Sequence, residues 1–214
     1  MPRPYTLSVT PDTPDPDGLA DNNDSSGSSV TLDGALTSGG TYTSVDGLGH
    51  RLDIIDTATV DQSGATFTVT GTNANGEAVT EAITGPGSGA TVESTEYFKT
   101  VTSITIASAA ACGTVDIGTV DEVATPTYVV NWRSAIELGF SVEITGTIDY
   151  DVQHTLDNIL NDGTASTTYL DHSAVAAQTA SADGNYDFGI TGMRVITNSY
   201  TGGATIKLNI VQGY

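Results

Sequence analysis

Bulky and polar residues alternate along residues 140–156, and this alternation is the clearest structural signal in the chain. The even positions carry Phe, Val, Ile, Tyr, His or Leu, except for Gly146, and the odd positions carry Ser, Glu, Thr, Asp or Gln. A side-chain period of two is typical of a β-strand with one face buried and the other in water. One strand over the whole run would extend about 55 Å, far beyond the usual length. We therefore expect Gly146 to bend the run or to divide it into two strands.

Strand patterns also occur elsewhere in the chain. Those at 65–70 and 78–84 are joined by Asn-Ala-Asn-Gly at 73–76, where Asn and Gly suit the positive φ angles of a tight turn, so a β-hairpin is expected there. Residues 193–200 and 204–211 predict a final hairpin across Thr-Gly-Gly at 201–203, with Ala204, Ile206, Leu208 and Ile210 on one face. Further strand signals lie at 29–32, 52–55, 99–106 and 113–120.

Composition divides the chain into three parts. Residues 1–29 are rich in Pro and Asp and have little apolar surface to bury, so we expect a flexible acidic arm. The strand pattern resets around Pro126, because proline cannot donate to a strand ladder, which predicts one β domain at 30–125 and a second at 126–214. The expected fold class is all-β: two β-sandwich or jelly-roll-like domains with an extended N-terminal arm.

The charge of the chain excludes several kinds of partner. Six Lys and Arg residues stand against 26 Asp and Glu residues, which gives a formal net charge of −20. This charge repels phosphate backbones and anionic lipid, so neither nucleic acid nor a membrane is an expected partner. The sequence has no secretory signal or long apolar run, and we expect it to fold in the cytosol. Cys112 is the only cysteine and is expected to be an inert packed thiol.

Two groups of polar residues were considered as metal sites. A loop rich in aspartate could hold Ca²⁺ through carboxylate oxygens, but it does not follow the EF-hand register, so a solvated acidic arm is favoured. Its aspartates are Asp12, Asp15, Asp17, Asp21 and Asp24. The histidines His50, His154 and His172 lack the spacing of metal ligands, and His154 is expected to be a satisfied core or interface residue. No metal or cofactor is predicted.

No catalytic residue is predicted either. Glu143, Asp149 and Asp151 share the odd-numbered face of the alternating run, and a glycosidase would use two such carboxylates. Ordinary solvated residues on an exposed strand face explain them more simply. The sequence also lacks the GxSxG motif of α/β-hydrolases and the lysine of a phosphate-binding loop. We therefore expect a protein that is not an enzyme.

Contact residues are expected among aromatic residues and one arginine, although core packing in the second domain is an equal alternative for the segment 128–133. Trp, Tyr and Arg dominate the energetics of protein interfaces, and chain ends are free to reach a partner. The residues selected on this basis are Tyr5, Tyr128, Trp132, Arg133 and Tyr214.

Two segments of the chain resemble proteins of tailed-bacteriophage virions. The first is FTVTGTNANGEAVTEAITGP at 67–86, followed by YFKTVTSITI at 97–106. The second, ASADGNY at 180–186 with GMRV at 192–195 and ATIKLNI at 204–210, is similar to the C-terminal β domain of small phage head proteins. The resemblance implies a capsid decoration or cement protein. Such proteins are non-enzymatic, often trimeric, and bind the capsid exterior across capsomer junctions of the major capsid protein.

Three classes of function remain open at this point. The first is the cement protein, made in the host bacterial cytoplasm and located in the virion with the major capsid protein and further copies of itself, as a homotrimer, as its partners. The second keeps the phage virion but places the chain in the tail, the head-tail connector or a head fibre. The third is a carbohydrate-binding β-sandwich, which ranks last because most of the 14 aromatic residues (Phe 4, Trp 1, Tyr 9) are needed for cores.

Overall fold

The computed structural model describes residues 4–107, 113–131 and 137–213, and these form two compact units. The terminal unit comprises Met1–Thr13 and Asp121–Tyr214, and the central unit comprises Pro14–Val120. Each is built almost entirely from antiparallel strands, so the expected all-β class with sandwich domains is confirmed. No helix in the described ranges is long and apolar enough to span a membrane.

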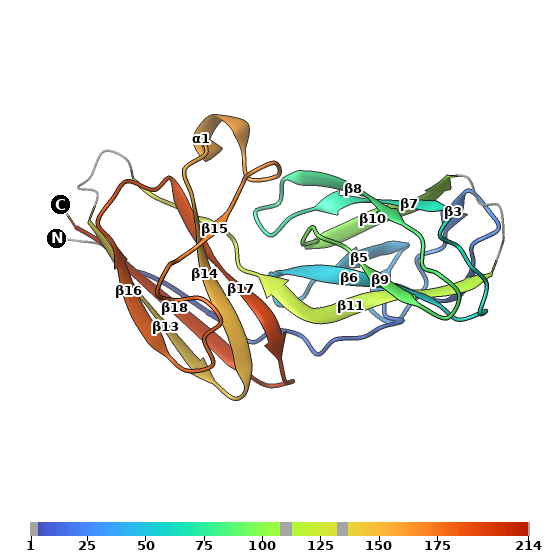
Figure 1. The fold of residues 1–214 in the computed structure, drawn as a ribbon, viewed down its shortest axis with the longest axis horizontal. Helices are drawn as coiled ribbons and strands as arrows, with labels where there is room; N and C mark the ends of the chain where they lie inside the picture. The colour runs from blue at the N-terminus through green and yellow to red at the C-terminus, as the bar shows by residue number, and fades with distance from the viewer. Residues whose placement is uncertain (1–3, 108–112, 132–136, 214) are drawn as a thin grey trace. The chain divides into compact units, whose positions relative to one another are not determined.

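The terminal unit is a sandwich of two layers (Figure 1). The first layer contains, in spatial order, β1 (Tyr5–Val9), β18 (Thr205–Gln212), β13 (Leu138–Thr145) and β16 (Ala182–Tyr186). The second contains β15 (Leu170–Asp171), β14 (Ile148–Thr155) and β17 (Gly192–Tyr200), and β17 also pairs with β12 (Tyr128–Val129) and with the last residue of β11 (Thr114–Ala124). The short helix α1 (Ile159–Asp162) follows β14.

Alternate residues of both layers form the core of the terminal unit. Phe140 and Val142 of β13 and Leu208 and Ile210 of β18 are buried from one layer, and Tyr150 of β14 is fully buried from the other. The odd positions of β13 and β14 are more exposed than the even ones, except for Thr155 at the end of β14, which is buried. The alternation in residues 140–156 therefore marks the core correctly up to His154.

Gly146 divides the alternating run as expected, but the two strands do not form a hairpin. Gly146 has φ +86° and lies between β13 and β14. β13 pairs with β16 and β18, whereas β14 pairs with β15 and β17. The chain therefore crosses from one layer to the other at this turn, and even-numbered side chains of both strands point into the shared core.

The predicted final hairpin is wrong for the same reason. β17 and β18 match the predicted strands closely, and Ile206, Leu208 and Ile210 are buried as expected. However, β17 pairs with β14 and β18 pairs with β13 and β1. The Thr-Gly-Gly segment at 201–203 links two layers and not two neighbouring strands. A short glycine-containing turn does not distinguish these two connections.

The expected flexible N-terminal arm is also revised. Residues 5–9 form β1, which pairs in register with β18 from Tyr5↔Ile210 to Val9↔Ile206. Residues 20–24 form β2, which pairs with β11, and Ser29 and Val30 form β3, which pairs with β10 (Thr100–Ala107). These short strands are ordered by partners far away in the sequence, so local composition could not reveal them. The two units meet between Val120 and Asp121, inside the uninterrupted strand β11, and not at Pro126.

The central unit is a second sandwich (Figure 1). One layer contains β4 (Thr37–Ser38), β5 (Thr41–Thr43), β10 (Thr100–Ala107), β7 (Thr66–Thr72) and β8 (Ala78–Thr84), with β3 (Ser29–Val30) also on β10. The other contains β9 (Thr91–Glu93), β6 (Gly49–Asp56), β11 and β2 (Ala20–Asp24). Both layers contribute to one hydrophobic cluster, which includes Leu52, Phe67, Ile104 and Ile117.

The predicted hairpin in the central unit is confirmed. β7 and β8 pair directly from Thr66↔Thr84 to Thr72↔Ala78. In the turn, the Asn73 carboxamide oxygen accepts the backbone N–H groups of Asn75 and Glu77, and Gly76 has φ +83°. Side-chain bonds to the turn backbone and a glycine at positive φ are local features, which is why sequence alone identified this hairpin.

Gly71 permits a close approach of β7 to β10. A Cβ atom at Gly71 would overlap the carbonyl oxygen of Thr100, next to the register shift between Val101 and Ser103. We therefore expect Gly71→Ala to destabilise the protein by about 3 kcal/mol, because the two central strands would have to separate. Urea unfolding followed by circular dichroism measures the loss. Gly64→Ala is the control, since a Cβ there meets nothing within 4 Å and φ is not positive. Equal free energies of unfolding for Gly71→Ala and Gly64→Ala would contradict the inferred close approach of β7 to β10.

Candidate interaction surface

Two of the five predicted contact residues lie together in the terminal unit. The rings of Tyr5 in β1 and Tyr128 in β12 are 4.9 Å apart between centroids and are tilted by 44°. β1 is an edge strand of one layer and β12 lies beside β17 in the other, so the pair bridges the two layers. Burial, together with the neighbouring Tyr128, raises the pKa of the Tyr5 hydroxyl. Trp132, Arg133 and Tyr214 lie outside the described residues.

Exposed apolar side chains collect around one end of the same unit. Their positions follow from strand register: Val129 and Thr155 both pair with Gly192, Leu156 follows Thr155, and Leu170 pairs with His154. We call this surface the apolar end. Its large exposed side chains are Val129, Leu156, Leu160, Leu170 and Phe188. Leu156 and Leu160 are 58% and 59% exposed, which is high for leucine in a folded domain.

A pocket of about 400 Å³ opens at the apolar end. Val130, Leu160 and Thr191 line it together with the polar side chains Asn158 and Asn161. The backbone N–H of Val130 donates to the Thr191 carbonyl at 2.9 Å, which fixes one wall. Ile159 of α1 packs so closely on Gly192 that a Cβ atom there would lie 2.6 Å from its Cδ1 atom. The helix is thereby held against β17, and Leu160 is presented outward.

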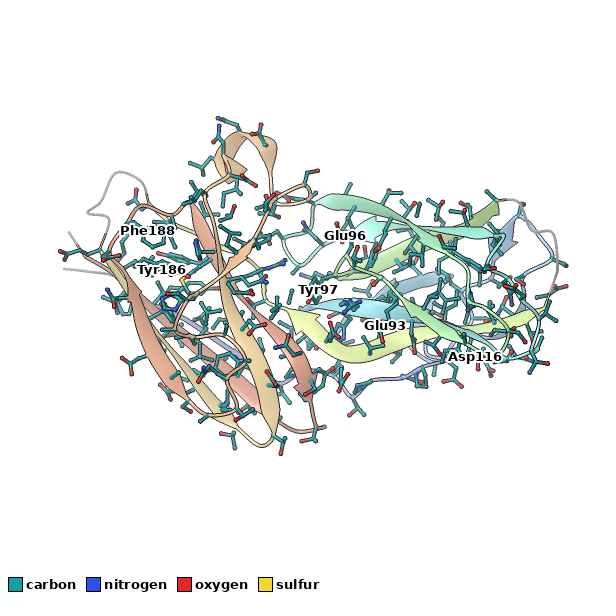
Figure 2. All side chains as sticks on the ribbon, viewed as in Figure 1. Glu93, Glu96, Tyr97, Asp116, Tyr186 and Phe188 are labelled. Atoms are coloured by element: carbon teal, nitrogen blue, oxygen red, sulfur yellow. The ribbon has the colours of Figure 1, made fainter. Side chains whose placement is uncertain are left out.

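An aromatic cluster supports the apolar end from inside. Tyr186 is at its centre, with ring centroids 5.0 Å from His172, 5.1 Å from His154, 5.7 Å from Phe140 and 5.6 Å from Phe188. Tyr186 is 1% exposed, whereas Phe188 is 46% exposed, so the cluster extends from the core to the surface (Figure 2). A rigid aromatic support of this kind holds a surface side chain in one place and lowers the entropic cost of binding.

The polar atoms in this cluster are only partly satisfied. The Ala174 N–H donates to Nδ1 of His172 at 3.3 Å, and Nε2 of His172 lies 3.2 Å from the Asn185 carbonyl. Within the described residues, neither the Tyr186 hydroxyl nor Nδ1 of His154 has a hydrogen-bond partner. His154 is thus buried as expected but is not fully satisfied. Burial and the nearby His172 lower its pKa, opposed by Asp171, and burial raises the pKa of Tyr186.

The third histidine lies in the central unit and has a different environment. Nε2 of His50 is 3.0 Å from a carboxylate oxygen of Asp46, and both side chains are buried. Asp46 also accepts hydrogen bonds from the Ser44 hydroxyl and the Leu48 N–H. Burial opposes ionisation of Asp46, but His50 and these donors outweigh it and lower its pKa to about 2. This pair fixes the turn between β5 and β6.

Of the three carboxylates that a glycosidase could use, Glu143 is separated from Asp149 and Asp151. Glu143 lies on β13 and pairs with Lys207 at 3.2 Å. Asp149 and Asp151 lie on β14, in the other layer, and both accept hydrogen bonds from the Asn198 amide at 3.0 Å. The division of the run at Gly146 separates Glu143 from the two aspartates, so the three do not form one continuous strand face.

The acidic loop of the central unit forms local contacts. A hydrogen bond between the side chains of Asp15 and Asp17, with burial, raises the pKa of Asp15, and Asp24 accepts the Ser26 N–H at 2.8 Å. No three carboxylates among the described residues 14–29 come within 4.8 Å of one another. Proton sharing therefore accounts for Asp15 and Asp17, and capping of a turn accounts for Asp24.

The exposed leucines at the apolar end were missed by sequence reasoning. Leu156 continues the even positions of the alternating run and was expected on the buried face. β14 instead ends at Thr155, whose hydroxyl oxygen accepts the Asp157 N–H at 3.0 Å, and the chain turns away. The polar Asp-Asn pair at 157–158 is the available signal for this turn. Leu160 lies in the four-residue helix α1, Leu170 in the two-residue strand β15 and Phe188 just after β16, and such short segments show no readable period.

Comparison with known proteins does not place the chain in a family. No protein-family model and no curated protein sequence matches it. Among solved structures, the major capsid protein P2 of bacteriophage PM2 shares 9% identity over 98% of this chain and 97% of that chain, with a TM-score of 0.21. A structure of infectious bursal disease virus strain Gx shares 12% identity over 98% of this chain and 69% of that chain, with a TM-score of 0.24. Likeness at this level carries no argument about fold or function.

The environment of His154 predicts a loss of stability in mild acid. Because its pKa is lower in the folded chain than the ordinary value of about 6.5 in the unfolded chain, protonation favours unfolding. This contribution is complete above the ordinary pKa and is lost as the pH falls below it. We expect the His154 imidazole resonance, assigned by its loss in His154→Phe, to titrate below pH 6.5 by NMR.

The same variant provides the stability test. His154→Phe keeps a ring in the cluster but carries no titratable proton, so the decrease in unfolding free energy between pH 7 and pH 5 is expected to be smaller than in the unaltered chain. Thermal unfolding across this pH range measures how steeply the unfolding free energy changes with pH in the variant and in the unaltered chain. Identical slopes, or a His154 resonance that titrates above pH 6.5, would contradict the assignment.

Proposed function

We propose that the protein is a non-enzymatic structural component of a tailed-phage virion, which binds the capsid exterior and stabilises capsomer junctions as a cement or decoration protein. The observation that carries the proposal is the apolar end: exposed leucines, a pocket and the Tyr5–Tyr128 pair lie around one end of a rigid β-sandwich. The resemblance of residues 67–86 and 204–210 to phage virion proteins gives the class of partner, the major capsid protein.

The composition of the apolar end suits a protein partner. Leu156 and Leu160 offer apolar area, Asn158 and Asn161 offer amide groups at the pocket, and the Tyr5–Tyr128 pair offers aromatic rings with hydroxyls. Apolar and tyrosine side chains with a polar border are the usual composition of an interface core and its rim. A sugar-binding surface would instead need exposed aromatic faces, and in the cluster around Tyr186 only Phe188 is substantially exposed.

A cement protein needs only a modest contact area on each capsid subunit. Many copies bound to one particle, each across several subunits, make weak individual contacts effective because the later contacts are intramolecular. The formal charge of −20 keeps unbound copies soluble and apart. A homotrimer placed at a capsomer junction would use the apolar end of each subunit in the same way.

Truncation of apolar side chains at this end is expected to weaken particle binding. Leu160→Ser should lower occupancy on capsids at limiting protein concentration by about tenfold, because burial of a leucine contributes roughly 1.5–3 kcal/mol. Co-sedimentation with capsids that lack the protein measures occupancy. Val45→Ser is the control: Val45 is 89% exposed and lies in the central unit. Thermal unfolding checks that both variants remain folded. Equal binding by both variants would remove the apolar end from the proposal.

Cryo-electron microscopy of the particle that carries the chain tests its location. We expect density on the capsid exterior at capsomer junctions. Density along the tail axis, at the connector or in head fibres would overturn the cement assignment and favour the other virion roles. Absence from any particle would overturn the virion role altogether and reopen the sugar-binding alternative.

A further inference from the structure

Among the described residues, one outer face of the central unit carries no charged side chain. On β7, Phe67 and Val69 point into the core, and the outward positions are all threonine. The neighbouring strands also present threonine on this side. Thr80 of β8 lies opposite Thr70 of β7, and Thr105 of β10 lies opposite Thr68 of β7. We call this surface the threonine face. Its outward residues are Thr43, Thr66, Thr68, Thr70, Thr72, Ala78, Thr80, Ala82, Thr84, Thr100, Ser103, Thr105 and Ala107.

The nearest acid on these strands points to the other side. Glu81 of β8 lies opposite Val69, and its carboxylate accepts the backbone N–H groups of Thr95 and Glu96 at 2.8 and 3.0 Å. Its charge is thus directed at a turn and away from the threonine face. Lys99 and Glu77 precede β10 and β8, outside the strands themselves.

The opposite layer of the same unit is strongly acidic. Glu93 of β9 and Asp116 of β11 are labelled in Figure 2, and both raise the pKa of Asp53 on β6, although burial is the larger cause. Asp53 reaches a pKa of about 6. Arg51 forms an ion pair with Glu93 at 3.2 Å. In a chain with a formal net charge of −20, an entire sheet face without charge is therefore a specific local feature.

We propose that the threonine face is a contact surface between two copies of this chain, which associate face to face about a twofold axis. A twofold contact requires a surface that is complementary to itself. A hydroxyl both donates and accepts, and a threonine methyl packs on another methyl, so two threonine arrays satisfy each other. Two acidic faces of this protein would repel, whereas the threonine face lets two negatively charged chains approach without placing like charges in contact.

The size of the face indicates a weak association. Strands about 4.8 Å apart with a rise of about 3.3 Å per residue give a surface of roughly 20 by 23 Å. Two such faces bury about 1,000 Å² in total, which is the lower limit for a specific interface. The contact is therefore expected at high concentration or high local copy number, and higher salt strengthens it by screening the net charge. It concerns the free chain and does not depend on the proposed virion role.

Sedimentation velocity over a range of concentrations in 0.5 M salt, about the strength that screens beyond a few ångströms, tests the proposal. A twofold contact doubles the mass of the species present at low concentration, so a monomer gives a dimer and a trimer gives a hexamer. We expect this doubling in the unaltered chain. Its absence at the highest soluble concentration would overturn the proposal.

Paired substitutions of opposite charge identify the face. Thr80 is exposed in the free chain, so Thr80→Glu and Thr80→Lys are expected to fold, which thermal unfolding confirms for each. Both should raise the dissociation constant of the association by about tenfold or more, because the contact would bury either charge without a partner. Association governed by net charge alone would instead strengthen with Lys and weaken with Glu, and that result would contradict the proposal.

The matched controls are Thr179→Glu and Thr179→Lys at an exposed threonine of the terminal unit. Both should leave the doubling unchanged. Leu160→Ser, which tests particle binding, should also leave it unchanged, so failure of one proposal is distinguishable from failure of the other. Doubling that persists in both Thr80 variants would place the contact on another surface.

Discussion

Each β-layer of this protein has one apolar face, and such a face leaves water only when a second layer covers it. In the terminal unit, Val142 and Leu208 of one layer pack toward Tyr150 of the other, and in the central unit Phe67 and Ile117 belong to one shared cluster. The short edge strands, the crossing turns and the sites at the surface all follow from this pairing of layers. The pairing also limits where function can lie, because packed apolar side chains occupy most of the interior in the described part of the chain.

What remains available for interaction is the ends of the sandwiches and their outer faces, and these differ chemically. The apolar end presents leucines and tyrosines supported by the cluster around Tyr186. The threonine face presents hydroxyls and methyls without charge, and the opposite layer of the central unit presents carboxylates around Asp53. Because these surfaces are chemically distinct, each of the two units can contact a different kind of neighbour.

Sequence patterns predicted the structure correctly where the interacting residues are close together in the chain. The 66–84 hairpin was predicted because Asn73 and Gly76 form the turn and the paired strands are adjacent. The alternation predicted which residues of β13 and β14 are buried. Tyr5 and Tyr128 were selected because tyrosine is common at protein interfaces and chain ends can reach partners, and their contact across the two layers could not be predicted from their positions in the chain.

The sequence by itself determined the fold class, the period of the alternating strands, the buried face of β13, β14 and β18, and the strong negative charge. It did so because alternation and turn chemistry act over a few residues. Only the tertiary structure decided which strands pair: β13 with β18 and not β14, and β1 with β18 across most of the chain. A hairpin and a crossing between layers bury the same alternate residues, so pattern cannot separate them. The exposed leucines and the uncharged threonine face appear only once that pairing is known.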